Sequence, residues 1–246
     1  MSENYKDSDW IVSHLKNFCI DSDEANYVLE HKYRFAYMLG DIIPKLAPGI
    51  KVANIGLSII DPLINEIISS YPAIYECLVP DNQFIEYFSQ NPNYQNIALE
   101  IYDVTKNNAN KNDVVMEKYD IVLFYETMEH LMAPDEMILA NITKILKHGG
   151  LLLGSVPNAA RAVARLNILE GRNIFWPKTR IINGVFNGWG HIREYTFSEM
   201  SELLSKYFEV QEMTGYSPYE RNWVRAILNH LPSGFRDIIS FEAKRK

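Results

Sequence analysis

Two carboxylates and a histidine follow a short apolar run near the middle of this 246-residue chain. Glu126, Glu129 and His130 are spaced i, i+3 and i+4, which would place them on one face of a helical turn. Such a group could hold a hard divalent cation such as Mg²⁺ and leave positions for water and for substrate oxygens. His191 is the candidate fourth ligand. The spacing therefore predicts a metal site, and packing or capping is the alternative role.

The same histidines could also act without a metal. A neutral imidazole near its unperturbed pKa can accept a proton at physiological pH, so His130 and His191 are the candidate catalytic bases. The other histidines show no ligand spacing, and we expect them on the surface or in the core. They are His14, His31, His148 and His230.

Alternating strands and helices must position these groups. The apolar run 121–125 is short and does not alternate, as expected of a parallel strand buried on both faces. Strands are expected at 51–56, 74–79, 96–101, 121–125, 151–156, 208–213 and 238–244. Helices fill most of the gaps, so the pattern predicts an α/β fold with a doubly wound, mainly parallel sheet and helices on both faces.

One connecting helix has clear start and stop signals. Pro134 and the acidic residues after it would open the helix at its positive end. Basic residues would close it, and Gly149 would supply a left-handed cap. These basic residues are Lys144, Lys147 and His148.

The two ends of the domain carry further elements. Helices expected at 8–20 and 23–46 make residues 1–48 a helical cover over a domain at 49–246. Residues 159–189 interrupt the strand and helix rhythm, and a long irregular stretch in a compact domain is usually functional. We expect this insertion to be a lid.

Composition limits the class of protein. A formal charge of -7 argues against a nucleic-acid partner bound through phosphates. No apolar run reaches the roughly 20 residues that a membrane span needs. Cys19 and Cys77 are far apart, and the first residues are polar and acidic, so we expect a reduced, cytoplasmic protein.

Three motifs carry a resemblance to a known family. Asp-aliphatic-aliphatic at 120–122, Glu-x-x-Glu-His-Leu at 126–131 and Leu-Lys-x-Gly-Gly at 146–150 resemble the second half of a class I S-adenosylmethionine-dependent methyltransferase. The pattern is most similar to the small-metabolite and glycan O-methyltransferases related to ubiquinone-biosynthesis enzymes. The resemblance spans about residues 50–244 and implies a seven-stranded Rossmann-like fold. It implies S-adenosylmethionine as cofactor, and an oxygen of a small metabolite, nucleotide-sugar or glycan as methyl acceptor.

The resemblance also implies cofactor-binding residues at the ends of successive strands. They are Gly56, Asp81, Asp103, Val104, Tyr125 and Glu126. Each acid has an alternative: Asp81 could cap a helix, Asp103 could be a turn aspartate, and Glu126 could sit at a helix start. Tyr125 could be a packed aromatic.

The first strand turn departs from the family. It keeps one of the usual two or three glycines, Gly56, which favours a rival hypothesis of a catalytically silent, methyltransferase-like binding or assembly domain. A nicotinamide-dependent oxidoreductase is disfavoured because G-x-G-x-x-G is absent.

Arginines and aromatics in the insertion are candidates for acceptor binding. Arginines could meet a phosphate or carboxylate on the acceptor, and aromatics could stack on a sugar or ring. The residues are Arg161, Arg165, Arg172, Phe175, Trp176, Arg180 and Trp189. Both tryptophans could instead be packing anchors.

Overall fold

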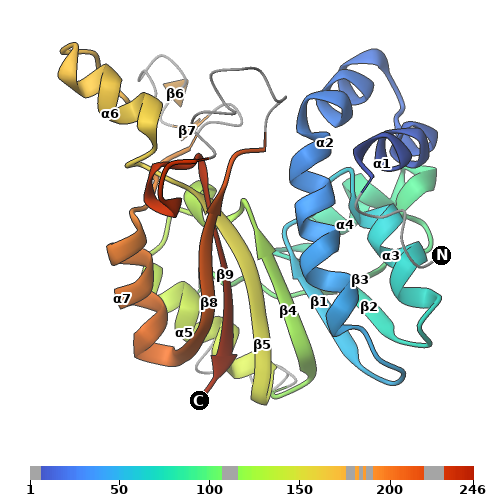
Figure 1. Cartoon of the computed structure of the whole chain (residues 1–246). Helices are drawn as coiled ribbons and strands as arrows, with labels where there is room; N and C mark the ends of the chain where they lie inside the picture. Colours follow the sequence, from blue (N-terminus) through green and yellow to red (C-terminus); the bar gives the residue numbers. More distant parts are fainter. Residues whose placement is uncertain (1–6, 107–115, 176–180, 183–184, 187–190, 219–229) are drawn as a thin grey trace.

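A seven-stranded sheet forms the centre of the computed structural model, which describes residues 7–106, 116–175, 181–182, 185–186, 191–218 and 230–246 (Figure 1). The strand order is β3-β2-β1-β4-β5-β9-β8. The first five strands are parallel, and β9 runs antiparallel to both β5 and β8. The strands are β1 (Lys51–Ile55), β2 (Ile74–Val79), β3 (Ala98–Ile101), β4 (Tyr119–Tyr125), β5 (Leu146–Pro157), β8 (Phe208–Tyr216) and β9 (Ile238–Arg245). The predicted doubly wound, mainly parallel seven-stranded fold is confirmed.

Helices cover both faces of the sheet (Figure 1). The helices α1 (Ser8–Leu15), α2 (Ser22–Ile42) and α3 (Asp61–Ser69) contribute to one hydrophobic core, while α5 (Asp135–Ile145) and α7 (Phe197–Tyr207) contribute to a second. Alternate residues of β4 point into each core: Leu123 into the first and Phe124 into the second. This two-sided burial explains the continuous apolar run in its sequence.

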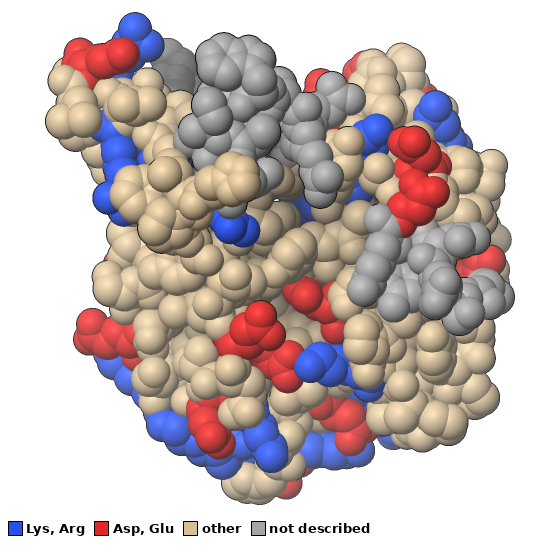
Figure 2. Space-filling model, in the orientation of Figure 1, with Lys and Arg blue, Asp and Glu red and all other residues tan. Residues whose placement is uncertain are grey.

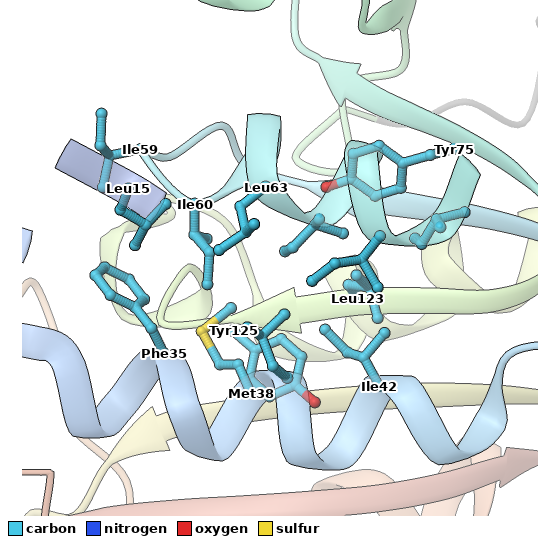
Figure 3. Packing of buried hydrophobic residues seen from close by; sticks show 14 of the residues in the cluster. Leu15, Phe35, Met38, Ile42, Ile59, Ile60, Leu63, Tyr75, Leu123 and Tyr125 are labelled. Carbon is cyan, nitrogen blue, oxygen red and sulfur yellow. The ribbon is translucent and has the colours of Figure 1, made fainter. Parts of the chain in front are cut away.

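The expected N-terminal cover is part of the first core. Leu15, Phe35 and Met38 of α1 and α2 pack with Ile60 and Leu63, which follow β1 (Figure 3). Both helices begin at aspartates that cap them, Asp7 and Asp21. Each predicted helix ends in a separate 3-10 turn, Lys16–Phe18 and Ile43–Lys45.

The remaining elements are short. They are α4 (Asn82–Ser89), α6 (Ala162–Leu169), and the two-stranded pair β6 (Ile181–Ile182) and β7 (Val185–Phe186). No helix in the described ranges combines the length and the apolar character needed to cross a bilayer.

The predicted end of the helix after Pro134 is wrong. α5 ends at Ile145, because Leu146 is already extended and pairs with Tyr119 of β4. Lys147 and His148 therefore lie in β5. Gly149 has a left-handed φ of 73°, but it does not cap a helix. It belongs to a bulge in β5, after which the pairing with β4 resumes at Leu151.

Figure 2 shows acidic side chains gathered near the middle of one face of the molecule. Asp41 of α2 lines a small cavity of about 30 Å³ together with residues of β5, β8 and β9. Its Oδ2 atom accepts from the Ser240 hydroxyl at 3.2 Å and lies 3.5 Å from the Tyr125 hydroxyl. Burial, with Glu212 and Glu242 nearby, raises its pKa to about 6. Lys45 does not offset this charge directly, because it pairs with Glu242 at 2.5 Å.

We expect Asp41→Asn to stabilise the fold at pH 8 by about 1–2 kcal/mol. The raised pKa means that the fold favours the protonated acid. The stability that protonated Asp41 contributes is therefore fully present below its ordinary pKa of 3.8 and is lost as the pH rises through about 6. The full shift corresponds to about 3 kcal/mol, and partial solvent screening reduces this value. Urea unfolding at pH 4 and pH 8 checks it. An equal effect of the substitution at both pH values would contradict the assignment.

Candidate active site

A buried polar group lies where β4 and β5 end. Glu126, directly after β4, has a left-handed φ of 49°, which is strained for a residue with a side chain. Two bonds with Ser155 of β5 hold it: the Glu126 amide donates to the Ser155 carbonyl at 2.9 Å, and the Ser155 hydroxyl donates to Oε1 at 2.7 Å. The sheet therefore fixes the direction of this carboxylate.

Arg34 reaches the same place from α2. Its NH1 atom lies 3.9 Å from Glu126 Oε2, and each side chain is only 13% exposed. Burial raises the pKa of Glu126, and Arg34 opposes that rise. The Arg34 guanidinium also donates to the Tyr27 hydroxyl, while its Nε atom has no hydrogen-bond partner within the described part of the chain. No sequence pattern pointed to Arg34, because it lies far from β4 in the chain and meets it only through packing.

The predicted helical turn at 126–130 is wrong. Only Met128–His130 turns, as a 3-10 helix, and Glu126 precedes it in a different backbone conformation. Glu126 consequently turns toward Ser155 and Arg34. Glu129, His130 and His191 form a separate group, in which one possible ligand atom from each residue lies within 4.8 Å of the others. The four-ligand prediction thus reduces to three residues that the fold brings together.

Glu129 is the most unusual member of that group. Its side chain is fully buried, and neither carboxylate oxygen has a hydrogen-bond partner among the residues that the structure describes. His130 Nε2 lies 3.9 Å from its Oε1 atom. Burial raises its pKa well above the ordinary value, and the neighbouring Glu126 raises it further. A buried unsatisfied carboxyl is costly, so its presence suggests function rather than stability.

His191 belongs to a segment that is held on two sides. The Ile192 amide donates to the Glu129 carbonyl at 2.8 Å, and the Tyr195 amide donates to the Pro157 carbonyl at 3.1 Å. The ring of His191 lies 5.2 Å from that of His130, at 70°. Sequence spacing alone could not place these residues together, but the structure confirms that they are neighbours.

The turn after β1 needs its single glycine. Gly56 has φ 96°, and a Cβ atom there would lie 2.8 Å from the Thr127 hydroxyl oxygen. Thr127 in turn donates to the Ile55 carbonyl at 3.2 Å, or to the Tyr125 carbonyl at 3.0 Å. The close approach of the β1 and β4 ends therefore excludes a side chain at this position.

A buried aspartate, Asp61, supports this turn through hydrogen bonds. Asp61 accepts from the Asn54 amide at 2.7 Å, from the backbone amide of Ser58 and from the Tyr75 hydroxyl. Cys77 Sγ is 3.4 Å away. Sequence reasoning missed this network. The available signal was an acid, Asp61, inside the apolar stretch 55–68.

The other predicted cofactor residues have structural partners. Asp81 caps α4 by accepting from the amides of residues 83 and 84, which is its alternative role, so we do not retain it in the site. Asp103 accepts from both donors of Thr105 and pairs with Lys106 at 2.9 Å. Burial alone would raise the pKa of Asp103, but these partners lower it. Val104 is buried in the second core.

The described arginines of the expected lid already have contacts within the chain. Arg161 pairs with Glu194, Arg165 lies 4.2 Å over the ring of Phe235, and Arg172 pairs with an exposed glutamate. Phe175 is 75% exposed. Trp176, Arg180 and Trp189 lie outside the described residues. The lid at 159–189 stays a prediction, and α6 lies within it.

Solved structures share this fold. An S-adenosylmethionine-dependent methyltransferase from Mesorhizobium loti matches with a TM-score of 0.57 and 14% identity over 87% of this chain and 98% of its own. A second such methyltransferase, from Archaeoglobus fulgidus, matches with a TM-score of 0.56 and 14% identity over 89% of this chain and 99% of its own. The N-methyltransferase NodS from Bradyrhizobium japonicum, solved with S-adenosyl-L-homocysteine, matches with a TM-score of 0.52 and 12% identity over 96% of this chain and 98% of its own. No family model and no curated protein matches the sequence. The chain therefore has the class I methyltransferase fold.

Proposed function

We propose that this chain is an S-adenosylmethionine-dependent methyltransferase that acts on an oxygen of a small metabolite, nucleotide-sugar or glycan. The observation that carries the proposal is the buried pair of Arg34 and Glu126 at the carboxyl ends of β4 and β5. In doubly wound sheets, ligands bind beyond these strand ends near the switch point. The sheet order places that point between β1 and β4.

The residues present fit this cofactor best at its amino-acid end. The methionine part carries an ammonium and a carboxylate, and Glu126 and Arg34 offer the opposite charges in a buried setting. Among the described residues, the Arg34 Nε atom has no acceptor. We assign Tyr125, the last residue of β4, to a place beside the methionine part, and Gly56 and Asp103, at the ends of β1 and β3, to the nucleoside side. The bound cofactor supplies an electrophilic methyl group.

The acceptor side of the proposal rests on two histidines. His130 or His191 would take the proton of the acceptor hydroxyl, and the turn at 128–130 and the anchored segment at 191–195 would hold the acceptor in line. Both imidazoles are partly exposed, 34% and 23%, so a small acceptor can reach them.

A specific observation supports the rival hypothesis of a silent binding or assembly domain. Gly56 is followed by Leu57, Ser58, Ile59 and Ile60, and Ile60 is fully buried in the first core (Figure 3). The Ser58 amide is already bonded to Asp61. This turn therefore offers less backbone to a nucleotide than a glycine-rich turn does.

Arg34→Ala is the variant that tests the binding geometry. We expect it to weaken S-adenosylhomocysteine binding by about 1.5–3 kcal/mol, because a charged hydrogen-bond partner of the ligand is removed. Calorimetric titration measures the difference. Lys32→Ala on the same helix, which removes a pair with the exposed Asp9, is the matched control and should bind as the wild type does. Equal affinity of the Arg34 variant would remove Arg34 from the site.

A divalent cation at Glu129, His130 and His191 is a second, separable part of the proposal. Mg²⁺ would favour the carboxylate and keep several waters, whereas two imidazoles favour a transition metal such as Zn²⁺. Zn²⁺ alone should then raise the thermal transition temperature, which corresponds to a gain of about 2.7 kcal/mol in stability at 100 times the Kd. His191→Ala should abolish this shift. Full methyl transfer in excess chelator, together with loss of activity in His191→Ala or His130→Ala, would instead identify a histidine as the base.

A further inference from the structure

The Glu194 carboxylate is divided between two side chains. Its Oε1 atom lies 3.1 Å from His191 Nδ1, and its Oε2 atom pairs with the Arg161 guanidinium. Only 14% of the Glu194 side chain is exposed. An ionised carboxylate can only accept hydrogen bonds, so we assign the imidazole proton to Nδ1. His191 Nε2 is then the nitrogen that carries the lone pair.

Arg161 neutralises the negative charge of the Glu194 carboxylate. Its guanidinium is permanently charged, and it also donates to the Asn158 carbonyl at 3.1 Å. Asn158 sits directly after β5, because β5 ends at Pro157. The row Arg161, Glu194 and His191 is therefore tied to the end of a central strand.

The backbone next to Glu194 is anchored on both sides. The Ile192 amide is bonded to the Glu129 carbonyl, and the Tyr195 carbonyl accepts from the Ala159 amide at 2.8 Å. These bonds fix the position of the segment. The hydrogen bond between His191 Nδ1 and Glu194 then helps to orient the ring and selects its tautomer.

We propose that Glu194, backed by Arg161, is a positioning residue that keeps His191 as the Nδ1–H tautomer, with the lone pair on Nε2 of a ring that lies beside Glu129 and His130. The role of His191 toward an acceptor or a cation rests on the function proposed above. The way in which His191 is held rests on geometry alone, so the two can fail separately.

The direct test is the tautomer of His191, read from long-range ¹H–¹⁵N correlation spectra of full-length protein with labelled histidine. His191→Asn identifies the signals by their loss. We expect the Nδ1–H tautomer in the wild type, a change to the other tautomer or to a mixture in Glu194→Ala, and recovery in Glu194→Gln, whose amide oxygen can still accept. Glu170→Ala, which removes only an exposed pair with Arg172, is the control and should leave the spectrum of His191 as in the wild type.

Kinetic and binding measurements provide a second test of the positioning role. If the chain transfers methyl groups, Glu194→Ala should lower kcat about 10- to 100-fold, as loss of an orienting partner does, while S-adenosylhomocysteine affinity stays at the wild-type value. A wild type that binds no S-adenosylhomocysteine would end the proposed function but not the positioning role. An unchanged His191 tautomer in Glu194→Ala, or a wild-type His191 protonated at Nε2, would overturn the inference whether or not the enzyme is active.

Discussion

Replacing Asp61 by alanine is expected to lower the free energy of unfolding by about 3–5 kcal/mol. Asp61 is fully buried and accepts from the Asn54 amide, the Ser58 backbone amide and the Tyr75 hydroxyl. Alanine would remove the acceptor of the Ser58 amide and of the Tyr75 hydroxyl, and each such loss costs about 1–3 kcal/mol. The Asn54 amide would keep only its bond to the Gly56 carbonyl, at 2.6 Å. The turn after β1 would lose its support at the same time.

Asp81→Ala is the matched control for this variant. Both aspartates stand at the start of a helix, but Asp81 only caps α4 by accepting from two amides. Loss of such a cap costs about 1 kcal/mol. Chemical unfolding of the two variants should separate them clearly. A loss of about 1 kcal/mol in both would mean that the Asp61 network does not hold the turn.

Replacing Glu129 by leucine is expected to have opposite effects on stability and on activity. The carboxyl is buried and has no hydrogen-bond partner among the described residues, so an apolar side chain of similar size should stabilise the fold by about 1–3 kcal/mol at pH 8. Because burial raises the pKa of Glu129, the fold favours the protonated carboxyl. The destabilisation that Glu129 causes therefore grows as the pH rises above the ordinary pKa of a glutamate. The gain from leucine should therefore be larger at pH 8 than at pH 5.

Methyl transfer by the same variant should fall by at least about 100-fold if Glu129 acts at the acceptor or holds a cation. Unfolding is measured in excess chelator, so that a bound cation does not mask the gain. Glu136→Leu on α5 is the control: Glu136 is exposed and pairs with Lys206, and its loss should change stability by no more than about 0.5 kcal/mol. A Glu129→Leu protein that is less stable at pH 8 would show that the carboxyl supports the fold.

The sheet could be predicted from sequence because parallel strands that are buried on both faces have short, continuous apolar runs. The run at 121–125 and the run at 151–156 both became central strands, and the strand expected at 238–244 became β9, which pairs antiparallel to β5. Strand ends were less predictable. Leu146 follows a helix directly, and the pairing that makes it part of β5 comes from Tyr119, which local sequence does not reveal.

The site was only partly predictable, because its geometry depends on contacts between distant segments. Helical spacing suggested that Glu126 would join Glu129 and His130, but its left-handed backbone turns it toward Ser155 instead. His191 lies beside His130, and their joint role as ligands or bases stays a prediction. Arg34 was missed because packing brings α2 to Glu126. Glu194 was missed although it lies only three residues from His191.

Calorimetric titration of the wild-type chain with S-adenosylhomocysteine tests the central claim most directly. The buried Arg34 and Glu126 pair and the Gly56 turn predict saturable one-site binding, with an affinity that falls in Arg34→Ala and is retained in Lys32→Ala. Folding of each sample is checked by thermal unfolding. A folded wild type that gives no binding at about 1 mM ligand, where even a Kd of 1 mM would be detected, would contradict the methyltransferase proposal and leave the silent domain as the better account.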